Sequence, residues 1–191
     1  MQTMTTVGRP RDPRVDEALR RVVQELLVAD GYSGLTVQGV ARTAGVSPAT
    51  VYRRFPGKRE LVEWAAFQVT EWVEPAWTGD YQRDLSILTE LLLAYLVQPA
   101  VRAAVPGLLA EYVHESSPYL ALLASTITPI RRALADLHDA AVDRGEAVQG
   151  VDHDALLDVL LGAVLLEAMT RTDPLRETAD RIADVIRRAT T

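Results

Sequence analysis

The sequence has no cysteine, which excludes disulfide bonds and thiolate metal sites. It also lacks a long apolar run: the longest, from Val159 to Leu166, holds eight residues, whereas a helix that spans a bilayer needs about 18. The first 14 residues place arginine and proline where a secretory signal has its apolar stretch, so we expect a cytoplasmic protein. The 191 residues are 48% hydrophobic and 24% charged, which excludes a collagen-like or disordered chain.

Charge is distributed unevenly along the chain. The formal net charge is −6, which by itself argues against a nucleic-acid ligand. Residues 1–60, however, hold 10 basic and 6 acidic side chains, whereas residues 61–191 hold 10 basic and 20 acidic ones. A basic segment joined to an acidic one is typical of a nucleic-acid-binding domain attached to a second, different domain, with chance clustering of solvated charges as the alternative.

Apolar residues recur at helical spacing along nearly the whole chain, and no segment alternates apolar and polar residues over six or more positions. We therefore expect an all-α protein. Gly31, Gly45 and the pair Pro56-Gly57 mark the ends of the first three helices. The expected helices cover residues 13–30, 37–44, 48–55, 58–73, 83–97, 101–114, 118–144, 152–169 and 175–189, with a bend at Pro129.

The pattern changes beyond the loop from Pro75 to Asp80. Before this loop the helices are short and capped, whereas after it they are longer and richer in apolar residues. We expect two domains, residues 1–60 and residues 61–191, connected by the helix from Lys58 to Val73.

Two short helices that follow a longer one have the pattern of a helix-turn-helix module. They are joined through Ala44-Gly45-Val46-Ser47, where Gly45 permits the positive φ that a tight turn between helices needs. Val51 and Phe55 lie four residues apart, so both are expected to pack inward against Val40.

The other side of the third helix is expected to face outward. Small residues near its start let the backbone approach base edges, and Arg53 is long enough for a bidentate contact with guanine in the major groove. The outward positions are Ala49, Thr50, Arg53 and Arg54, with Pro48 and Tyr52 at the edge.

The stretch from Leu35 to Val62, LTVQGVARTAGVSPATVYRRFPGKRELV, resembles the TetR family of bacterial transcriptional regulators. Thr36, the turn at residues 44–47, the run from Tyr52 to Phe55, and Lys58 followed by Leu61 stand where that family has them. Pro48-Ala49 departs from the more usual glycine-containing pair, which affects the bases that are read. The length of the chain and its number of helices also fit the family.

The resemblance implies a homodimeric regulator, most often a repressor, that binds a palindromic operator in double-stranded DNA and is released by a small, largely apolar effector. It implies phosphate contacts from Thr36, Tyr52 and Lys58. The basic residues before the first helix resemble arms that lie in the minor groove, with a disordered tail as the alternative. The DNA-binding residues expected are Arg9, Arg11, Thr36, Gln38, Arg42, Ser47, Pro48, Ala49, Thr50, Tyr52, Arg53, Arg54 and Lys58.

The helix from Asp152 to Met169 is apolar almost all round, so both of its sides must be buried. One side can be covered within a monomer. The other, together with the apolar stripe of the last helix, is better covered by a second subunit, and in the family these two helices form the dimer interface. Burial inside a monomeric bundle is the alternative. The expected dimerisation residues are Leu157, Leu161, Val164, Leu165, Ile182, Val185 and Ile186.

Bulky side chains of the second domain are candidates for the lining of an effector cavity, although aromatic residues at helical spacing more often form plain core. Glu167 lies beside an apolar stripe and is a candidate polar anchor, with a surface edge as the simpler reading. The expected ligand-binding residues are Trp64, Phe67, Trp72, Tyr95, Tyr112, Glu167 and Met169.

Catalysis finds little support in the sequence. The three histidines are not at the i, i+4 spacing of a zinc helix, and no glycine-rich phosphate loop is present. Asp152 and Asp154 flank His153 as metal ligands would, yet Asp152 is more simply the N-cap of a helix. We expect no enzymatic activity, no cofactor, no metal and no membrane partner. A helical small-molecule-binding protein, or a helical enzyme, whose helix-turn-helix serves protein contacts is the alternative.

Overall fold

The computed structural model describes residues 13–67, 74–112, 119–170 and 173–191, and within these ranges the chain forms helices and no strand. The all-α expectation is therefore confirmed. The chain divides into two compact units, residues 1–68 and residues 69–191, so the division falls after residue 68 rather than after residue 60. Within the described ranges, no single helix is long and apolar enough to cross a membrane, and only the helical segments Tyr81–Leu96 and Pro99–Glu111 together reach that length and hydropathy, across an 83° bend.

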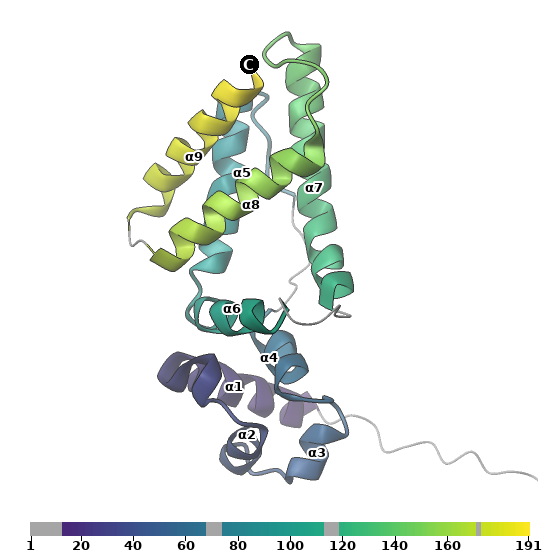
Figure 1. Ribbon diagram of the computed structural model, residues 1–191, viewed down its shortest axis with the longest axis vertical. Helices are drawn as coiled ribbons and strands as arrows, with labels where there is room; N and C mark the ends of the chain where they lie inside the picture. The colour runs from purple at the N-terminus through teal and green to yellow at the C-terminus, as the bar shows by residue number, and fades with distance from the viewer. Residues whose placement is uncertain (1–12, 68–73, 113–118, 171–172) are drawn as a thin grey trace, which may run out of the picture. The chain divides into compact units, whose positions relative to one another are not determined.

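The described part of the first unit, residues 13–67, contains the helices α1 (Pro13–Gly34), α2 (Val37–Thr43), α3 (Pro48–Tyr52) and α4 (Lys58–Ala66) (Figure 1). Gly31 has φ 68° and ψ 177°, so the regular part of α1 stops at the glycine that the sequence marked as its end. Helix α1 packs against α2 and α4, and α2 packs against α3. The core of the unit includes Leu19, Val40 and Val51, all fully buried, which confirms the inward face predicted for the third helix.

Two helices of the first unit are shorter than expected. Helix α3 ends at Tyr52 rather than at Phe55, because the backbone turns more tightly there, with Arg54 N and Phe55 N both bonded to the carbonyl of Val51. Helix α4 ends at Ala66, and Phe67 has the non-helical angles φ −96° and ψ 75°. The remainder of the expected helix, residues 68–73, lies outside the described ranges.

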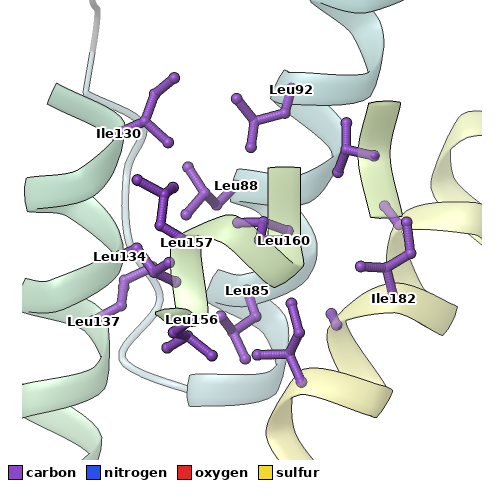
Figure 2. Close-up of a cluster of buried hydrophobic side chains, with 14 of the residues drawn as sticks. Leu85, Leu88, Leu92, Ile130, Leu134, Leu137, Leu156, Leu157, Leu160 and Ile182 are labelled. Carbon is purple, nitrogen blue, oxygen red and sulfur yellow. The ribbon is translucent and has the colours of Figure 1, made fainter. Parts of the chain in front are cut away.

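The second unit consists of α5 (Tyr81–Leu96), α6 (Pro99–Tyr112), α7 (Tyr119–Asp143), α8 (His153–Thr170) and α9 (Leu175–Thr190). Helix α5 packs against α7, α8 and α9. Figure 2 shows leucines of α5 in one cluster with side chains of all three neighbours, with Leu88 beside Leu157 and with Leu134 and Ile182 on opposite sides. One apolar core thus holds the unit together, and burial of such side chains is its main source of stability.

Local hydrogen bonds fix where α5 and α8 begin. Asp80 caps α5 by accepting from Arg83 N at 2.8 Å. The buried carboxylate of Asp84 accepts from the backbone and hydroxyl of Thr78 and from Gly79 N, which folds the preceding loop back onto the helix. Asp152 accepts from Asp154 N at 2.9 Å, so the N-cap interpretation of this aspartate is confirmed.

Candidate nucleic-acid interface

Helices α2 and α3 form a capped pair joined by a tight turn. Thr36 Oγ1 accepts from Gly39 N at 3.0 Å at the start of α2, and Ser47 Oγ accepts from Thr50 N at 3.2 Å at the start of α3. Gly45, between them, has φ 69°, the left-handed conformation that favours glycine. Threonine and serine at the caps and glycine in the turn therefore determine the helix-turn-helix locally.

Helix α3 presents a nearly continuous outer face because Val51 alone among its residues is buried. Pro48, Ala49 and Arg53 are exposed, as predicted for side chains that approach base edges. Ser47 Oγ and Thr50 Oγ1 lie 2.9 Å apart, so these two hydroxyls bond to each other beside that face.

Polar side chains that the sequence predicts to contact DNA flank α3. Tyr52 is 46% exposed, and its hydroxyl accepts from Gln38 Nε2 at 3.3 Å, which joins α3 to α2. Arg42 is exposed in the last turn of α2. Lys58 begins α4, with its ammonium 4.2 Å from the centre of the Tyr32 ring. Hydroxyl and ammonium groups of this kind are those that bind phosphate oxygens.

Arg54 differs from the other expected DNA contacts. Its guanidinium forms an ion pair with Asp16 of α1, and the side chain is only 18% exposed. An arginine engaged in this way does not present a free outward charge, so the outward position expected for Arg54 is corrected. Arg9 and Arg11, the expected minor-groove arm, lie outside the described ranges.

Two of the expected ligand contacts lie in the first unit. The ring of Trp64 on α4 packs against that of Phe55 at 4.9 Å between ring centres, tilted by 43°, and the Arg20 guanidinium of α1 lies 4.6 Å from the centre of the Trp64 ring. Both neighbours belong to the first unit, so these contacts give Trp64 a packing role in the helix-turn-helix unit. Phe67 directly follows α4. Trp72 lies outside the described ranges, as does the side chain of Tyr112, the last residue of α6.

The second unit holds the other expected ligand contacts. Burial raises the pKa of Tyr95 on α5 above its ordinary value. Glu167 on α8 forms an ion pair with Arg181 at 3.1 Å and lines a cavity of about 210 Å³. The Met169 carbonyl accepts from Arg102 at 3.5 Å near the same cavity. That cavity is bounded by Leu93, Val97, Arg102, Glu167, Ala168, Asp173, Leu175 and Thr178.

A second hollow of about 560 Å³ lies between α5 and α9. It contains none of the expected ligand contacts, and charged side chains of both signs, including Arg83, Glu90 and Arg176, line it. Within the described ranges, no group of three or more histidine, aspartate or glutamate side chains is arranged to hold a metal ion.

The residues expected at a dimer interface fall into two groups. Four of them already belong to the core of one chain, where they pack against neighbouring helices, so the expectation that they face a second chain is corrected; these are Leu157, Val164, Ile182 and Ile186. Leu161 and Leu165 are half-buried, and Val185 is 61% exposed. Val159 and Leu166, which are not among the expected dimerisation residues, are 59% and 63% exposed on α8.

The second unit also contains a buried polar cluster that the sequence did not predict. The Tyr81 hydroxyl lies 3.1 Å from His138 Nδ1 and 3.1 Å from Thr190 Oγ1. Burial, and to a lesser extent the nearby imidazole of His153, lowers the pKa of His138. These residues lie on three different helices, so no local pattern in the sequence indicates their contact.

Comparison with known proteins agrees with this arrangement. The model of the bacterial regulatory proteins of the tetR family matches residues 24–65, and that of the tetracyclin repressor-like C-terminal domain matches residues 75–186. An uncharacterised HTH-type transcriptional regulator of Mycobacterium tuberculosis is 34% identical over 178 residues, which cover 92% of this chain and 86% of that protein.

Two further similarities extend over most of the chain. The DNA-binding transcriptional repressor TetR of Mycobacteroides abscessus is 33% identical over 83% of each chain. The structure of the regulator FadR from Bacillus subtilis in complex with stearoyl-CoA superimposes with a TM-score of 0.62 at 14% identity, covering 90% of this chain and 97% of that one. With its helix-turn-helix unit and its helical C-terminal unit both matched, the chain belongs to the TetR family of DNA-binding transcriptional regulators.

Proposed function

We propose that this regulator is a repressor that binds a palindromic operator as a homodimer and leaves it when a small-molecule effector binds. The observation that supports DNA reading by the first unit is the outer face of α3, where Pro48, Ala49 and Arg53 are exposed while Val51 anchors the helix in the core. Tyr52 and Lys58 flank this face and supply phosphate contacts. The relative from Mycobacteroides abscessus, itself described as a repressor, favours that direction of control.

The homodimer is proposed from the apolar surface that α8 and α9 leave uncovered. Val159 and Leu166 lie seven residues apart, so they project from the same side of α8, and Val185 is exposed on α9. A second copy that presents the same residues covers all three through a two-fold axis. A symmetric dimer requires two recognition helices on an operator with matching two-fold symmetry.

The effector site is proposed for the second unit. The cavity beside Glu167 and the half-buried Tyr95 offer polar groups among apolar helices, as in sites for largely apolar ligands. The FadR neighbour is described with stearoyl-CoA, so acyl chains are the first ligands to try. The effector can release DNA only if it binds more tightly to the conformation that fits DNA poorly, typically by about 1–3 kcal/mol. DNA must then weaken effector binding by the same factor.

Binding of the full chain to the DNA flanking its own gene tests the proposal. Fluorescence anisotropy over a range of salt concentrations should give a specific complex whose affinity falls steeply with salt, and footprinting should protect two symmetric half-sites. An affinity equal to that for scrambled DNA, or protection of one asymmetric half-site, would contradict it.

The effector part has its own test. Thermal shift against a series of fatty acids and acyl-CoA thioesters should reveal a ligand that stabilises the chain. Titration of that ligand with and without operator then measures the coupling. Equal affinities in the two titrations would mean that the second unit does not control the first.

A further inference from the structure

The chain that leaves α3 is attached to α1 by an ion pair. Arg54, two residues after the end of the helix, pairs through Nη2 with Asp16 Oδ1 in the first turn of α1. The two side chains are 18% and 31% exposed, so both are partly removed from water. A partly buried pair is screened less by salt than a fully exposed one.

A second contact lies one residue further along. The Phe55 ring packs against Trp64 of α4 in a tilted arrangement, and the guanidinium of Arg20 on α1 lies over the same tryptophan ring. Asp16 and Arg20 are four residues apart, so they lie on the same side of α1, one turn from each other. One side of α1 therefore contacts two successive residues that follow α3. The contact with Arg54 is direct, through Asp16, and the contact with Phe55 is indirect, because Arg20 packs on Trp64 and Trp64 packs on Phe55.

This attachment matters because α3 is a short helix. It contains only five residues, from Pro48 to Tyr52, and Val51 is its one buried side chain. A helix of little more than one turn has little intrinsic stability and depends on its contacts for its orientation. A change of a few degrees at its end moves the outward side chains relative to the bases that they must reach.

We propose that Arg54 is a positioning residue for DNA recognition: its ion pair with Asp16 orients α3, and it does not itself bind DNA. This inference rests on the proposed function, in which α3 reads the operator. Arg53 and Arg54 are then adjacent arginines with different roles. The exposed Arg53 contacts DNA, whereas the charge of Arg54 is neutralised by Asp16 and is not available to replace a counterion on the phosphate backbone.

The test uses the full chain and compares four variants, Arg54→Ala, Asp16→Ala, the charge exchange Asp16→Arg with Arg54→Asp, and Arg53→Ala as the matched control. Operator affinity is measured at several salt concentrations, and thermal melting verifies that each variant is folded. We expect Arg54→Ala and Asp16→Ala each to weaken operator binding about 3- to 10-fold with an unchanged salt slope. The charge exchange restores most of the affinity because it rebuilds the pair with reversed polarity.

Three results would overturn the proposal. The first is a salt slope that falls by about one in Arg54→Ala, as expected for the loss of a phosphate contact. The second is tighter DNA binding by Asp16→Ala, which would mean that Asp16 restrains a DNA-binding arginine. The third is a charge-exchanged variant that binds more weakly than either single variant. If Arg54→Ala does not fold, Arg54→Gln replaces it.

A measurement without DNA separates this proposal from the proposed function. Hydrogen exchange of the amides from Val51 to Phe55 should accelerate in Asp16→Ala and return towards the wild-type rate in the charge exchange. Unchanged exchange in Asp16→Ala would overturn the positioning role even if the operator is bound. Failure of the wild-type chain to bind any operator would instead overturn the proposed function, whatever the exchange rates.

Discussion

The ammonium of Lys58 lies 4.2 Å from the centre of the Tyr32 ring, and this contact joins the first residue of α4 to the end of α1. Tyr32 is buried, so its ring is a fixed surface on which the lysine rests. A cation over an aromatic face is attracted electrostatically by the ring. The proposed phosphate contact is therefore made by an ammonium whose position is already determined in the free protein.

Replacement of Lys58 should weaken DNA binding without changing sequence preference. We expect Lys58→Ala to lower affinity for operator and scrambled DNA by the same factor and to reduce the salt slope by about one. Lys58→Arg, which keeps the charge, is the control. Salt titrations of both variants on both DNAs give the result, and a loss confined to the operator would indicate a base contact instead.

Replacement of Arg53 should have the opposite signature. Because Arg53 is exposed on the outer face of α3, Arg53→Ala should reduce operator affinity by about 1–3 kcal/mol and relax the preference at one base position. Binding to a set of operators with single base changes measures this. Uniform weakening across the whole set would assign Arg53 to the phosphates.

Charges placed on the exposed face of α8 and α9 should prevent dimerisation without unfolding the chain. Leu166→Glu and Val185→Glu replace exposed side chains, so helix content is expected to be retained while sedimentation gives a mass near the 21.0 kDa of one chain. Ile186→Glu is the contrasting variant, since it buries an unpaired charge in the core and should unfold the second unit. A wild-type chain that sediments as a monomer at micromolar concentration would contradict the proposed dimer interface.

Stability should depend on pH through His138. Burial, together with the neighbouring His153, holds the pKa of His138 in the folded chain below its ordinary value of 6.5, against the opposing effects of the Val148 backbone and of Asp139. As the pH falls below about 6.5 the unfolded chain binds a proton that the folded chain does not, so the free energy of unfolding decreases until the folded pKa is passed. Above that range His138 contributes no pH dependence.

Denaturant unfolding between pH 5 and pH 8 checks this, with His138→Gln as the variant in which the dependence should become shallower. Glutamine does not titrate, and it can still bond to the Tyr81 hydroxyl that lies 3.1 Å from Nδ1 of the histidine. An equally steep dependence in His138→Gln would assign the effect to other groups.

Most of the helices could be predicted because their causes are local. Thr36, Ser47, Asp80 and Asp152 accept hydrogen bonds from amides two or three residues further along, so the residues that begin a helix are adjacent in sequence. Gly45 has its positive φ for the same local reason. The helix-turn-helix and its resemblance to the family therefore followed from the sequence alone.

Helix ends that depend on non-local contacts were predicted less well. Apolar spacing continues beyond Ala66, and the sequence gives no reason to end α4 there, yet Phe67 has non-helical angles. The period of a stripe indicates that a helix has an apolar face, but it does not identify the surface that covers that face.

The sequence by itself determined the all-α fold, the helix-turn-helix and the charge asymmetry, and it predicted a set of residues for DNA contact. Tertiary structure decided which of them are free for such contact, because the partner of Arg54 is Asp16, 38 positions away, and only the packing of α1 beside the end of α3 brings them together. Tertiary structure also decided which apolar residues of α8 and α9 pack in the core of one chain and which remain exposed. Both helices are covered on one side by α5, so Leu157 and Ile186 became core while Leu166 and Val185 stayed at the surface.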